Sequence, residues 1–518
     1  MSELFFLIPA AFCLRFLSVR HASLTFDSYG HLYFAQQVKG QNIGPFGEIR
    51  INVVGSSGLR IPFLWHWLIA LLPFGPVLRF QNWINAGIDA AFSILVYSIA
   101  LSIGVSARTA LFMALLYLLT PMWFSRLSTG PRITNLTPRL LSELIGNLFF
   151  IVTLLPLGFP AWLAAMCGVF LCMFVILASK FGLQAMLFLV PTISLITRDP
   201  MPSYAFFLGL IFAVILTEGK FLQTLNAQLH HLIWYFKKNL QGEMVISNRN
   251  SFAKLFSRPS SGGGALRHAG VICYRALAYN SYTAVVLKLP ILPIALVLYG
   301  ISIYVSGSEL SIVIVGPVIA ATILFFVVSV PLLLFLGEAE RYLNYVAFFI
   351  VMMGAMLLVN AGANYILWIL LGYGFLFWAI ESFFLQEFTK EGAIIASDAS
   401  DRVIKHLASR EGYTVVLAYP YHAVGVWRIM IETGHHVIYP VVADEEFRTM
   451  FEERFSADYP FVRLEKVDEM ANELGVNFMI VSKKHLAVRG IESWVPSSTW
   501  QKLDVGEPIY KVYQKSNG

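Results

Sequence analysis

The sequence predicts a polytopic membrane protein: an all-α bundle of about 11 transmembrane helices, followed by a small soluble α/β domain. Of its 518 residues, 57% are hydrophobic and 13% are charged, against roughly 45–50% and 25% in ordinary soluble proteins. Residues 1–386 carry 22 Lys and Arg against 12 Asp and Glu, whereas residues 387–518 carry 15 against 19. We therefore expect a membrane domain at 1–386 and a soluble domain at 387–518, and this composition excludes a typical cytosolic enzyme.

Apolar runs long enough to cross a bilayer recur through the membrane domain, since about 20 helical residues span the hydrocarbon core. The first run, 4–17, has no small-residue cleavage site after it, so we interpret it as an uncleaved span. The other ten runs lie at about 80–103, 108–124, 140–157, 160–178, 181–197, 203–217, 284–305, 311–336, 343–360 and 364–385. The Trp-rich stretch 62–76 is bracketed by prolines and is expected to lie in the headgroup region.

Three polar segments, 21–61, 125–139 and 218–283, are expected to form external loops of this domain. Loops of such length are usually functional. The last one carries eight Lys and Arg against two Glu and includes an amphipathic stretch at 221–240. The positive-inside rule favours a cytoplasmic location for so basic a loop, so its side of the membrane stays open at this point.

The soluble tail alternates β-type runs with helical stretches. The β-type runs are 393–396, 414–418, 436–442 and 477–481, and the helical stretches include 398–410, 424–432 and 467–474. Gly412, Gly434 and Gly475 each follow a helical stretch, where a C-cap favours a left-handed residue. Such alternation predicts a small α/β sheet. Because the tail contains no phosphate-binding glycine motif and no nucleophile motif, we expect it to cap or stabilise rather than to catalyse.

Metal and nucleic-acid sites are not indicated. The four cysteines and the histidines form no set with metal-ligand spacing. The net charge of +6 comes without a basic stripe interleaved with aromatic residues, so nucleic acid is excluded as a partner.

The most informative segment, 26–40, lies directly after the first span. Apolar and aromatic side chains recur in it at helical spacing and the pattern ends at Gly40, so we expect an amphipathic helix on the membrane surface. Asp27 stands where an N-cap residue belongs, and periodicity alone gives it only that structural role.

An acidic residue in a D-S-Y-x-H-L setting after the first span resembles the first external loop of GT-C glycosyltransferases. These membrane enzymes take sugars from polyprenyl-phosphate carriers, and they include protein O-mannosyltransferases, aminoarabinose transferases and oligosaccharyltransferase catalytic subunits. Further segments are similar to family motifs in the same order: the juxtamembrane helix 59–70, which has one proline where many members have two, the turn 178–182, and the E-R-Y at 340–342. The resemblance extends over about 340 residues.

The resemblance implies a hexosyl- or pentosyltransferase that moves a sugar from a polyprenyl-phosphate-linked donor to an external glycan, lipid or protein acceptor. It implies an integral protein of the cell or plasma membrane, in contact with membrane lipids, with a cytoplasmic N-terminus and an external C-terminal domain. Asp27 corresponds to the acidic residue that acts as general base or positions the acceptor. Lys180 corresponds to a lysine near the donor phosphate. Some members use a divalent cation such as Mg²⁺ or Mn²⁺ and others need none, so the cofactor stays open.

Arg139 and Arg341 are two further candidates for contact with the donor phosphate, because guanidinium groups bind phosphate bidentately whereas Lys acts as a point charge. The alternative for each of the three cations is snorkelling to the membrane interface. The residues expected at the acceptor, or as a second acidic group, are Glu48, Glu143, His31 and Tyr342.

Structural alternatives exist for the acidic candidates. Glu143 follows Arg139 by four residues, so the two are expected to form an ion pair on one helix face. Solvation in a loop is the simplest explanation of Glu48. Asp89 lies inside a predicted span, where an ionisable group is costly, and Asn82 and Asn85 share its face. This polar stripe fits either an interhelical hydrogen-bond network or the lining of a cavity.

Two other functions fit the same residues. A transporter or flippase of lipid-linked saccharides also needs intramembrane polar groups and basic contacts to lipid phosphate, and an inactive GT-C relative would act as a scaffold. Transporters often have inverted repeats with broken helices at matching positions. The sequence shows no such symmetry, which favours the transferase.

Overall fold

The structure is a computed structural model of the chain. It describes residues 2–20, 26–44, 47–60, 62, 64–127, 132–241, 249–257, 265–306, 310–421 and 423–516. Two compact units are present. Unit 1 comprises Met1–Ser23, Ile61–Trp65 and Arg79–Leu385, and unit 2 comprises Leu24–Arg60, His66–Leu78 and Gln386–Gly518.

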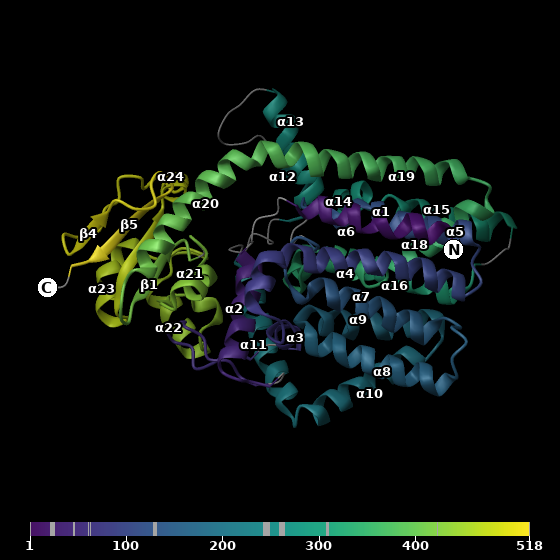
Figure 1. The fold of residues 1–518 in the computed structure, drawn as a ribbon, viewed down its shortest axis with the longest axis horizontal. Helices are drawn as coiled ribbons and strands as arrows, with labels where there is room; N and C mark the ends of the chain where they lie inside the picture. The colour runs from purple at the N-terminus through teal and green to yellow at the C-terminus, as the bar shows by residue number, and fades with distance from the viewer. Residues whose placement is uncertain are drawn as a thin grey trace. The chain divides into compact units, whose positions relative to one another are not determined.

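Unit 1 is a bundle of apolar helices (Figure 1). Its helices are α1 (Ser2–Val19), α4 (Phe74–Ser102, from Arg79), α5 (Ala107–Leu119), α6 (Pro121–Phe124), α7 (Pro138–Leu154), α8 (Ala161–Ala178), α9 (Lys180–Thr197), α10 (Met201–Leu216), α11 (Lys220–Leu240), α12 (Phe252–Phe256), α13 (Ala265–Tyr274), α14 (Ser281–Lys288), α15 (Ile291–Ser306), α16 (Ile312–Val328), α17 (Glu340–Asn344), α18 (Ala347–Asn360) and α19 (Asn364–Ala379). α8 packs against α7, α9 and α10, while α16 packs against α9 and α15 packs against α18.

Polar residues set several of the helix starts. Ser106 precedes α5, and its Oγ accepts a hydrogen bond from the backbone N of Thr109 at 3.2 Å. Thr137 precedes α7, whose first residue is Pro138. A side-chain oxygen at the N-cap and a proline at the first helical position both favour helix initiation, so these boundaries are set locally.

Four described helices are long and apolar enough to cross a membrane, namely Phe74–Ser102, Ala161–Ala178, Lys180–Thr197 and Asn364–Phe383. The number rises to six if two bent pairs each count as one span, namely Met201–Leu216 with Lys220–Leu240 and Ser281–Lys288 with Ile291–Tyr304. Helices also occupy the other predicted runs, but α5 and α18 have only 13 and 14 residues, fewer than the roughly 20 that a full crossing needs. The membrane class is confirmed, and the count of eleven stays a prediction.

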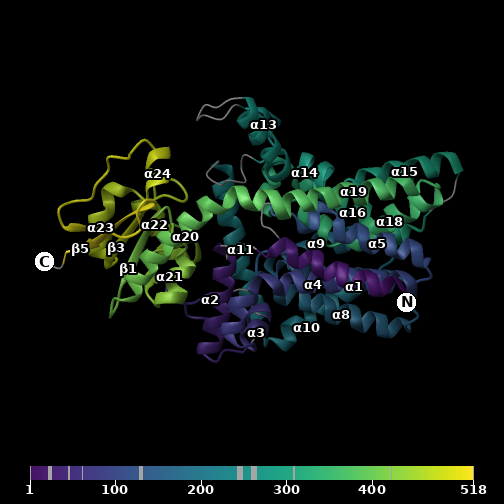
Figure 2. The ribbon, with the colours of Figure 1, turned by 45° about the horizontal axis from the view of Figure 1, so that its top comes forward.

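Unit 2 contains a small five-stranded sheet in the order β2-β1-β3-β5-β4. The strands are β1 (Val415–Tyr419), β2 (His436–Val437), β3 (Val476–Ser482), β4 (Trp500–Leu503) and β5 (Tyr510–Lys515), and the helices are α20 (Gln386–Ala408), α21 (Val426–Thr433), α22 (Glu445–Phe455), α23 (Val467–Glu473) and α24 (Lys483–Val488). β1 is parallel to β2 and β3, whereas β5 is antiparallel to β3 and β4. Figure 2 shows α20 and α21 beside β1.

The predicted strands 414–418 and 477–481 are present as β1 and β3, whereas the run 436–442 forms a strand only at His436–Val437 and ends in a short 3-10 helix at Pro440–Val442. One further predicted run is not a strand. Residues 393–396 lie within α20, so the β-type character of a four-residue apolar run was overridden by its helical surroundings. β4 and β5 were not predicted. Glycines 412, 434 and 475 have φ of +90°, +72° and +69°, as the C-cap prediction requires.

The segment after the first span belongs to unit 2 and extends its sheet. Val53 forms a parallel bridge with Val437 at the β2 edge. The backbone N of Val437 donates to Asn52 O at 3.0 Å, and the backbone N of Val54 donates to Val437 O at 3.0 Å. This segment and the tail therefore fold together. It also carries helix α2 (Phe26–Gly40), while α3 (Leu64–Ala70) has seven residues, about 10 Å of helix, which is too short to span a bilayer.

Candidate functional site

A chain of buried ion pairs runs through unit 1. Arg15 Nε lies 2.6 Å from Asp89 Oδ2, and both side chains are fully buried. Arg132 Nη1 lies 2.8 Å from Asp89 Oδ1, and Arg132 Nε lies 2.6 Å from Glu143 Oε2. Tyr117 donates its hydroxyl proton to Asp89 Oδ1 at 2.6 Å. Asp89 therefore belongs to a packed network, which is one of the two roles expected for the polar stripe.

The same network reaches Arg139. Arg139 Nε lies 3.0 Å from Glu143 Oε1, which is the ion pair expected from their spacing. Arg139 Nη1 lies 3.1 Å from Glu338 Oε2, and Asn344 Nδ2 donates to Glu143 Oε1 at 3.2 Å. Because carboxylates hold the guanidinium on two sides, the position of Arg139 is fixed by α7 and by the segment before α17.

Arg341 is held differently, by an aromatic ring. Its Cζ lies 3.8 Å from the ring centroid of Phe181, and its buried Nε has no hydrogen-bond partner within the described part of the chain. The ring of Phe181 also contacts Tyr342 at 5.3 Å between centroids, and the Tyr342 hydroxyl accepts a hydrogen bond from Gln184 Nε2 at 2.9 Å. A half-buried guanidinium whose buried Nε–H is unused is suited to an anionic ligand.

Lys180 begins α9, directly before Phe181. Its turn is stabilised by Ser179, whose Oγ accepts from the backbone N of Gly182 at 3.2 Å. Lys180 Nζ lies 2.8 Å from His231 Nδ1 on α11, and because an ammonium group only donates, the imidazole nitrogen accepts. Since Phe181 carries Arg341 on its face, the structure brings Lys180, Arg341 and Tyr342 into one region of unit 1.

A second buried cluster in unit 1 was not predicted from the sequence. Arg249 forms an ion pair with Glu340, and Ser281 Oγ donates to the other oxygen of Glu340 at 3.0 Å. Burial is the largest single influence on Glu340 and opposes its ionisation, but the charges of Arg249 and Lys288 and the hydrogen bonds to the carboxylate together hold its pKa below the usual value. Burial raises the pKa of Glu338 against the opposing effect of Arg139. The paired spacing of Glu338 and Glu340 beside Arg341 was the only sequence signal for this cluster.

The candidate base lies in unit 2. α2 begins at Phe26, so Asp27 occupies the first helical turn rather than the N-cap position. Asp27 is an exposed residue. Burial is the main cause of the raised pKa of Tyr439, and the charge of Asp27 adds to it, which places Asp27 within electrostatic reach of that tyrosine.

The other first-loop candidates also lie in unit 2. His31 Nδ1 lies 2.7 Å from His66 Nε2, and the two rings stack with centroids 5.0 Å apart. Burial lowers the pKa of His31 to about 4, so the ring is neutral at pH 7. Glu48 Oε2 lies 2.8 Å from Arg60 Nη2 in an exposed pair, which fits the structural alternative for Glu48.

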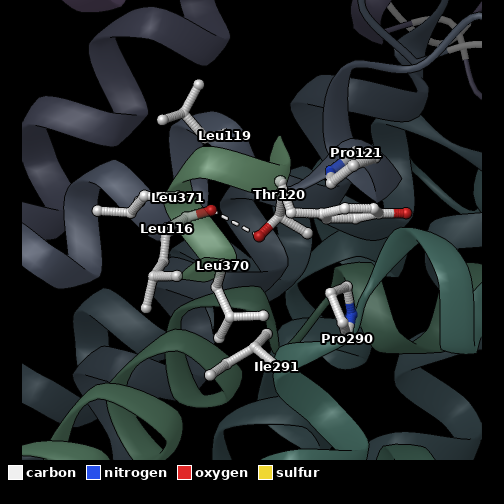
Figure 3. Close-up of a pocket in the computed structure, with 9 residues that line it drawn as sticks. Leu116, Leu119, Thr120, Pro121, Pro290, Ile291, Leu370 and Leu371 are labelled. Atoms are coloured by element: carbon white, nitrogen blue, oxygen red, sulfur yellow. Dashed lines mark hydrogen bonds between the residues drawn. The ribbon is translucent and has the colours of Figure 1, made fainter. Parts of the chain in front are cut away.

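Neither a group of metal-ligating side chains nor a suitable cavity identifies the site within the described residues. The described residues contain no group of three or more His, Cys, Asp and Glu side chains arranged to hold a metal ion. A small pocket near Thr120 (Figure 3) has a volume of about 10 Å³. Such a volume holds one water at most. Thr120 Oγ1 donates a hydrogen bond to Leu116 O at 2.6 Å. A larger cavity of about 490 Å³, between Ile103 and Asn360, has no charged residue in its lining and does not suit a phosphate.

Solved structures of membrane glycosyltransferases share this fold. The oligosaccharyltransferase of Archaeoglobus fulgidus in its apo form is similar with a TM-score of 0.54 and 11% identity, over 97% of this chain and 72% of that one. ArnT from Cupriavidus metallidurans bound to undecaprenyl phosphate is similar with a TM-score of 0.53 and 11% identity, over 99% and 98%. No protein-family model matches the sequence, and no curated protein matches it. Both solved neighbours are GT-C glycosyltransferases, so the resemblance seen in the sequence is confirmed at the level of the fold.

Proposed function

We propose that this chain is an integral membrane glycosyltransferase that moves a sugar from a polyprenyl-phosphate-linked donor to an external acceptor. The observation that carries the proposal is the environment of the Arg341 guanidinium. Its guanidinium lies on Phe181 and keeps a buried donor without a partner among the described residues, in a fold shared with ArnT, which was solved with undecaprenyl phosphate bound. A buried charged donor without a partner is costly, and a phosphate oxygen would satisfy it.

The chemistry assigns the roles. A glycosyl phosphate reacts when an acceptor attacks the anomeric carbon and the phosphate leaves. The reaction needs a carboxylate that takes the acceptor proton and cations that stabilise the departing charge. We assign the first role to Asp27 and the second to Arg139, Lys180 and Arg341. A single displacement of this kind inverts the anomeric centre.

The remaining candidates support these groups. Glu143 orients Arg139 through their ion pair, and Tyr342 packs on the ring that carries Arg341. His31, which is neutral at pH 7 because burial lowers its pKa, and Glu48 are proposed on the acceptor side. We propose a hexosyl or pentosyl donor and a glycan, lipid or protein acceptor.

The chain segments that make up unit 2 support a particular orientation of the protein in the membrane. Leu24–Arg60, which follows the first span, forms one compact unit with Gln386–Gly518. A folded unit with exposed polar backbone lies in one aqueous compartment, so the first loop and the tail share a side. We propose eleven spans, with the boundary at 386/387, a cytoplasmic N-terminus and the three loops 21–61, 125–139 and 218–283 external.

Binding of undecaprenyl phosphate tests the cation assignment. The purified protein in nanodiscs is titrated with this lipid, and we expect Arg341→Gln and Lys180→Gln each to weaken binding at least tenfold. The matched control is Arg454→Gln, which removes an exposed cation of unit 2. Equal affinities for all four proteins would contradict the assignment.

Turnover tests the role of Asp27. Proteoliposomes are supplied with radiolabelled hexoses and pentoses linked to undecaprenyl or dolichyl phosphate. We expect Asp27→Asn to lower turnover by about 10²-fold or more with undecaprenyl phosphate binding unchanged, and we expect Asp504→Asn, an exposed site in unit 2, to have no effect. Unchanged turnover in Asp27→Asn would refute the assignment, and lipid-sugar translocation without transfer would establish the transporter.

A further inference from the structure

Helix α2, which carries Asp27, packs against α21 of the same unit (Figure 2). The contact centres on Trp427, whose side chain is 6% exposed. Phe34 meets the indole edge-on at 5.0 Å between centroids, and Phe26 and Tyr33 lie at 6.1 Å each. Three side chains within nine residues of α2 therefore contact one indole ring.

Gly30 brings the α2 backbone onto the same ring. A Cβ at this position would lie 3.0 Å from Trp427 Nε1 and 3.1 Å from its Cδ1, tighter than ordinary van der Waals contact. The φ of Gly30 is that of an ordinary helical residue, so glycine is needed here for space and not for backbone freedom. The helix and the indole are thus in direct contact one turn beyond Asp27.

Arg428, the next residue of α21, holds the first turn of α2 from the side. Its Cζ lies 5.7 Å from the ring centroid of Tyr29. The guanidinium is itself fixed, because it lies 2.5 Å from Asp401 Oδ1 on α20 and 2.7 Å from Glu432 Oε1. Asp27 is therefore flanked along the chain by Phe26 and Tyr29, two residues that α21 contacts.

At the far end of α21, Asn52 links this helix to α2 through two hydrogen bonds. Asn52 Nδ2 donates to Gly434 O, at the C-cap of α21, at 2.8 Å. The backbone N of Asn52 donates to the hydroxyl of Tyr33 on α2 at 2.8 Å. Both ends of α21 are thereby connected to α2, so a rotation of α2 would break aromatic and hydrogen-bonded contacts together.

We propose that Trp427 is a positioning residue, which sets the orientation of Asp27 by fixing the rotation and the height of α2 on α21. The inference rests on the proposed function, because it concerns the same carboxylate. It assigns the tail a role that its sequence did not suggest: the α/β unit is the support of the general base. A shift of about 1 Å in a reacting group can lower a rate by 10², so loosening this contact reduces turnover without removing any reacting atom.

The first experiment compares Trp427→Ala and Trp427→Phe with the control Trp500→Phe. Trp500 is equally buried but lies on β4, at the opposite edge of the sheet from β2. We expect Trp427→Ala to lower kcat at least tenfold, to leave the Kd for undecaprenyl phosphate unchanged and to speed hydrogen exchange in residues 26–40. Trp427→Phe should recover most of the turnover, and the pH profile of kcat should shift in Trp427→Ala alone.

A double-mutant cycle with Gly30→Ala tests the contact from the other side. Alone, the added methyl presses on the indole, and we expect a kcat loss similar to that of Trp427→Ala. In the Trp427→Ala background the same methyl finds space, so Gly30→Ala should cost little more. Additive losses would show that the two residues act separately and would overturn the inference.

The outcomes separate this inference from the proposed function. If Asp27→Asn abolishes turnover while Trp427→Ala speeds exchange in α2 and leaves kcat unchanged, the base assignment stands and the positioning role fails. If Asp27→Asn leaves turnover intact, the proposed function fails by itself, whatever Trp427 does. If exchange in α2 is the same in Trp427→Ala and the wild type, the indole does not fix the helix and the inference is overturned.

Discussion

The two units use ion pairs in opposite ways. In unit 1, Arg15 and Asp89 are both fully buried and 2.6 Å apart, and further pairs continue the chain to Arg139. In unit 2, Arg454 and Glu469 are also close, at 2.7 Å, but their side chains are 43% and 32% exposed. The geometry of the two pairs is similar, so the difference lies in the surrounding solvent.

This difference shows what buried pairs contribute. Bringing a charge out of water costs several kcal/mol, and the partner recovers this only when geometry and hydrogen bonds are good. A buried network is therefore weak evidence of added stability, but it fixes its members in place. In unit 1 the members include Arg139, which we propose as a phosphate ligand, and the network is suited to hold that guanidinium before the ligand arrives.

The largest effect is expected from Asp89→Asn. The substitution leaves Arg15 and Arg132 buried with one counter-ion fewer, and breaking a buried pair costs about 3–5 kcal/mol. Thermal unfolding in detergent should show a markedly lower midpoint than for Glu469→Gln, the matched change in an exposed pair. Equal midpoints would mean that the buried network is no more sensitive than a surface pair.

The next largest effect is a dependence of the stability of unit 2 on pH. Burial lowers the pKa of His31 from the usual 6.5 to about 4, so the unfolded chain takes up a proton at a higher pH than the folded one. The stability of unit 2 is then greatest above pH 6.5 and falls as the pH drops toward 4, by up to about 3 kcal/mol. Hydrogen exchange in residues 26–40, measured from pH 7.5 to pH 4.5 and corrected for intrinsic rates, should reveal this loss.

His31→Gln provides the control for this pH dependence. A glutamine side chain does not titrate, so the slope of stability against pH should flatten in the variant. An unchanged slope would assign the effect to other histidines of unit 2, such as His436 or His485, whose pKa values are also lowered by burial.

A smaller effect is expected where a cation in unit 1 is held by a ring and not by a carboxylate. Phe181→Leu keeps the site apolar but removes the ring 3.8 Å below Arg341. A cation–π contact contributes about 1–2 kcal/mol when partly desolvated, so affinity for undecaprenyl phosphate should fall by about tenfold. Phe188→Leu, on the same helix, is the control. Unchanged affinity in Phe181→Leu would show that the ring does not hold Arg341 for the ligand.

The sequence predicted the class of the fold well and the arrangement of its charges poorly. Apolar runs and the 13% charge content reveal membrane helices, because the bilayer constrains composition directly. Arg15 lies within the first apolar run, 4–17. Its partner Asp89 lies 74 residues away, and only the packing of α1 against its neighbours brings the two together. Costly intramembrane charges at both positions were the available signal.

Unit 2 shows a second limit of sequence reasoning. The D-S-Y-x-H-L segment drew attention to Asp27, but nothing local indicated that α2 packs on α21, some 400 residues later. The contact depends on shape: a glycine at position 30 faces the ring of Trp427. A lone glycine in a helical pattern is a weak signal of close packing, and its partner appears only when the tail is folded.

The smallest effect is expected from removing an exposed ion pair of unit 2. This prediction tests whether exposed pairs contribute as little as the comparison with the buried pairs of unit 1 implies. Arg454 forms ion pairs with both Glu469 and Glu473, so its number of partners alone would suggest a large contribution to stability. Its solvent exposure leads to the opposite expectation, because water screens each contact and ordering a long side chain costs entropy. Arg454→Gln should leave the unfolding midpoint and the affinity for undecaprenyl phosphate unchanged within error. A clear loss of stability in this variant would mean that the number of partners, rather than burial, decides how much a charge contributes in this protein.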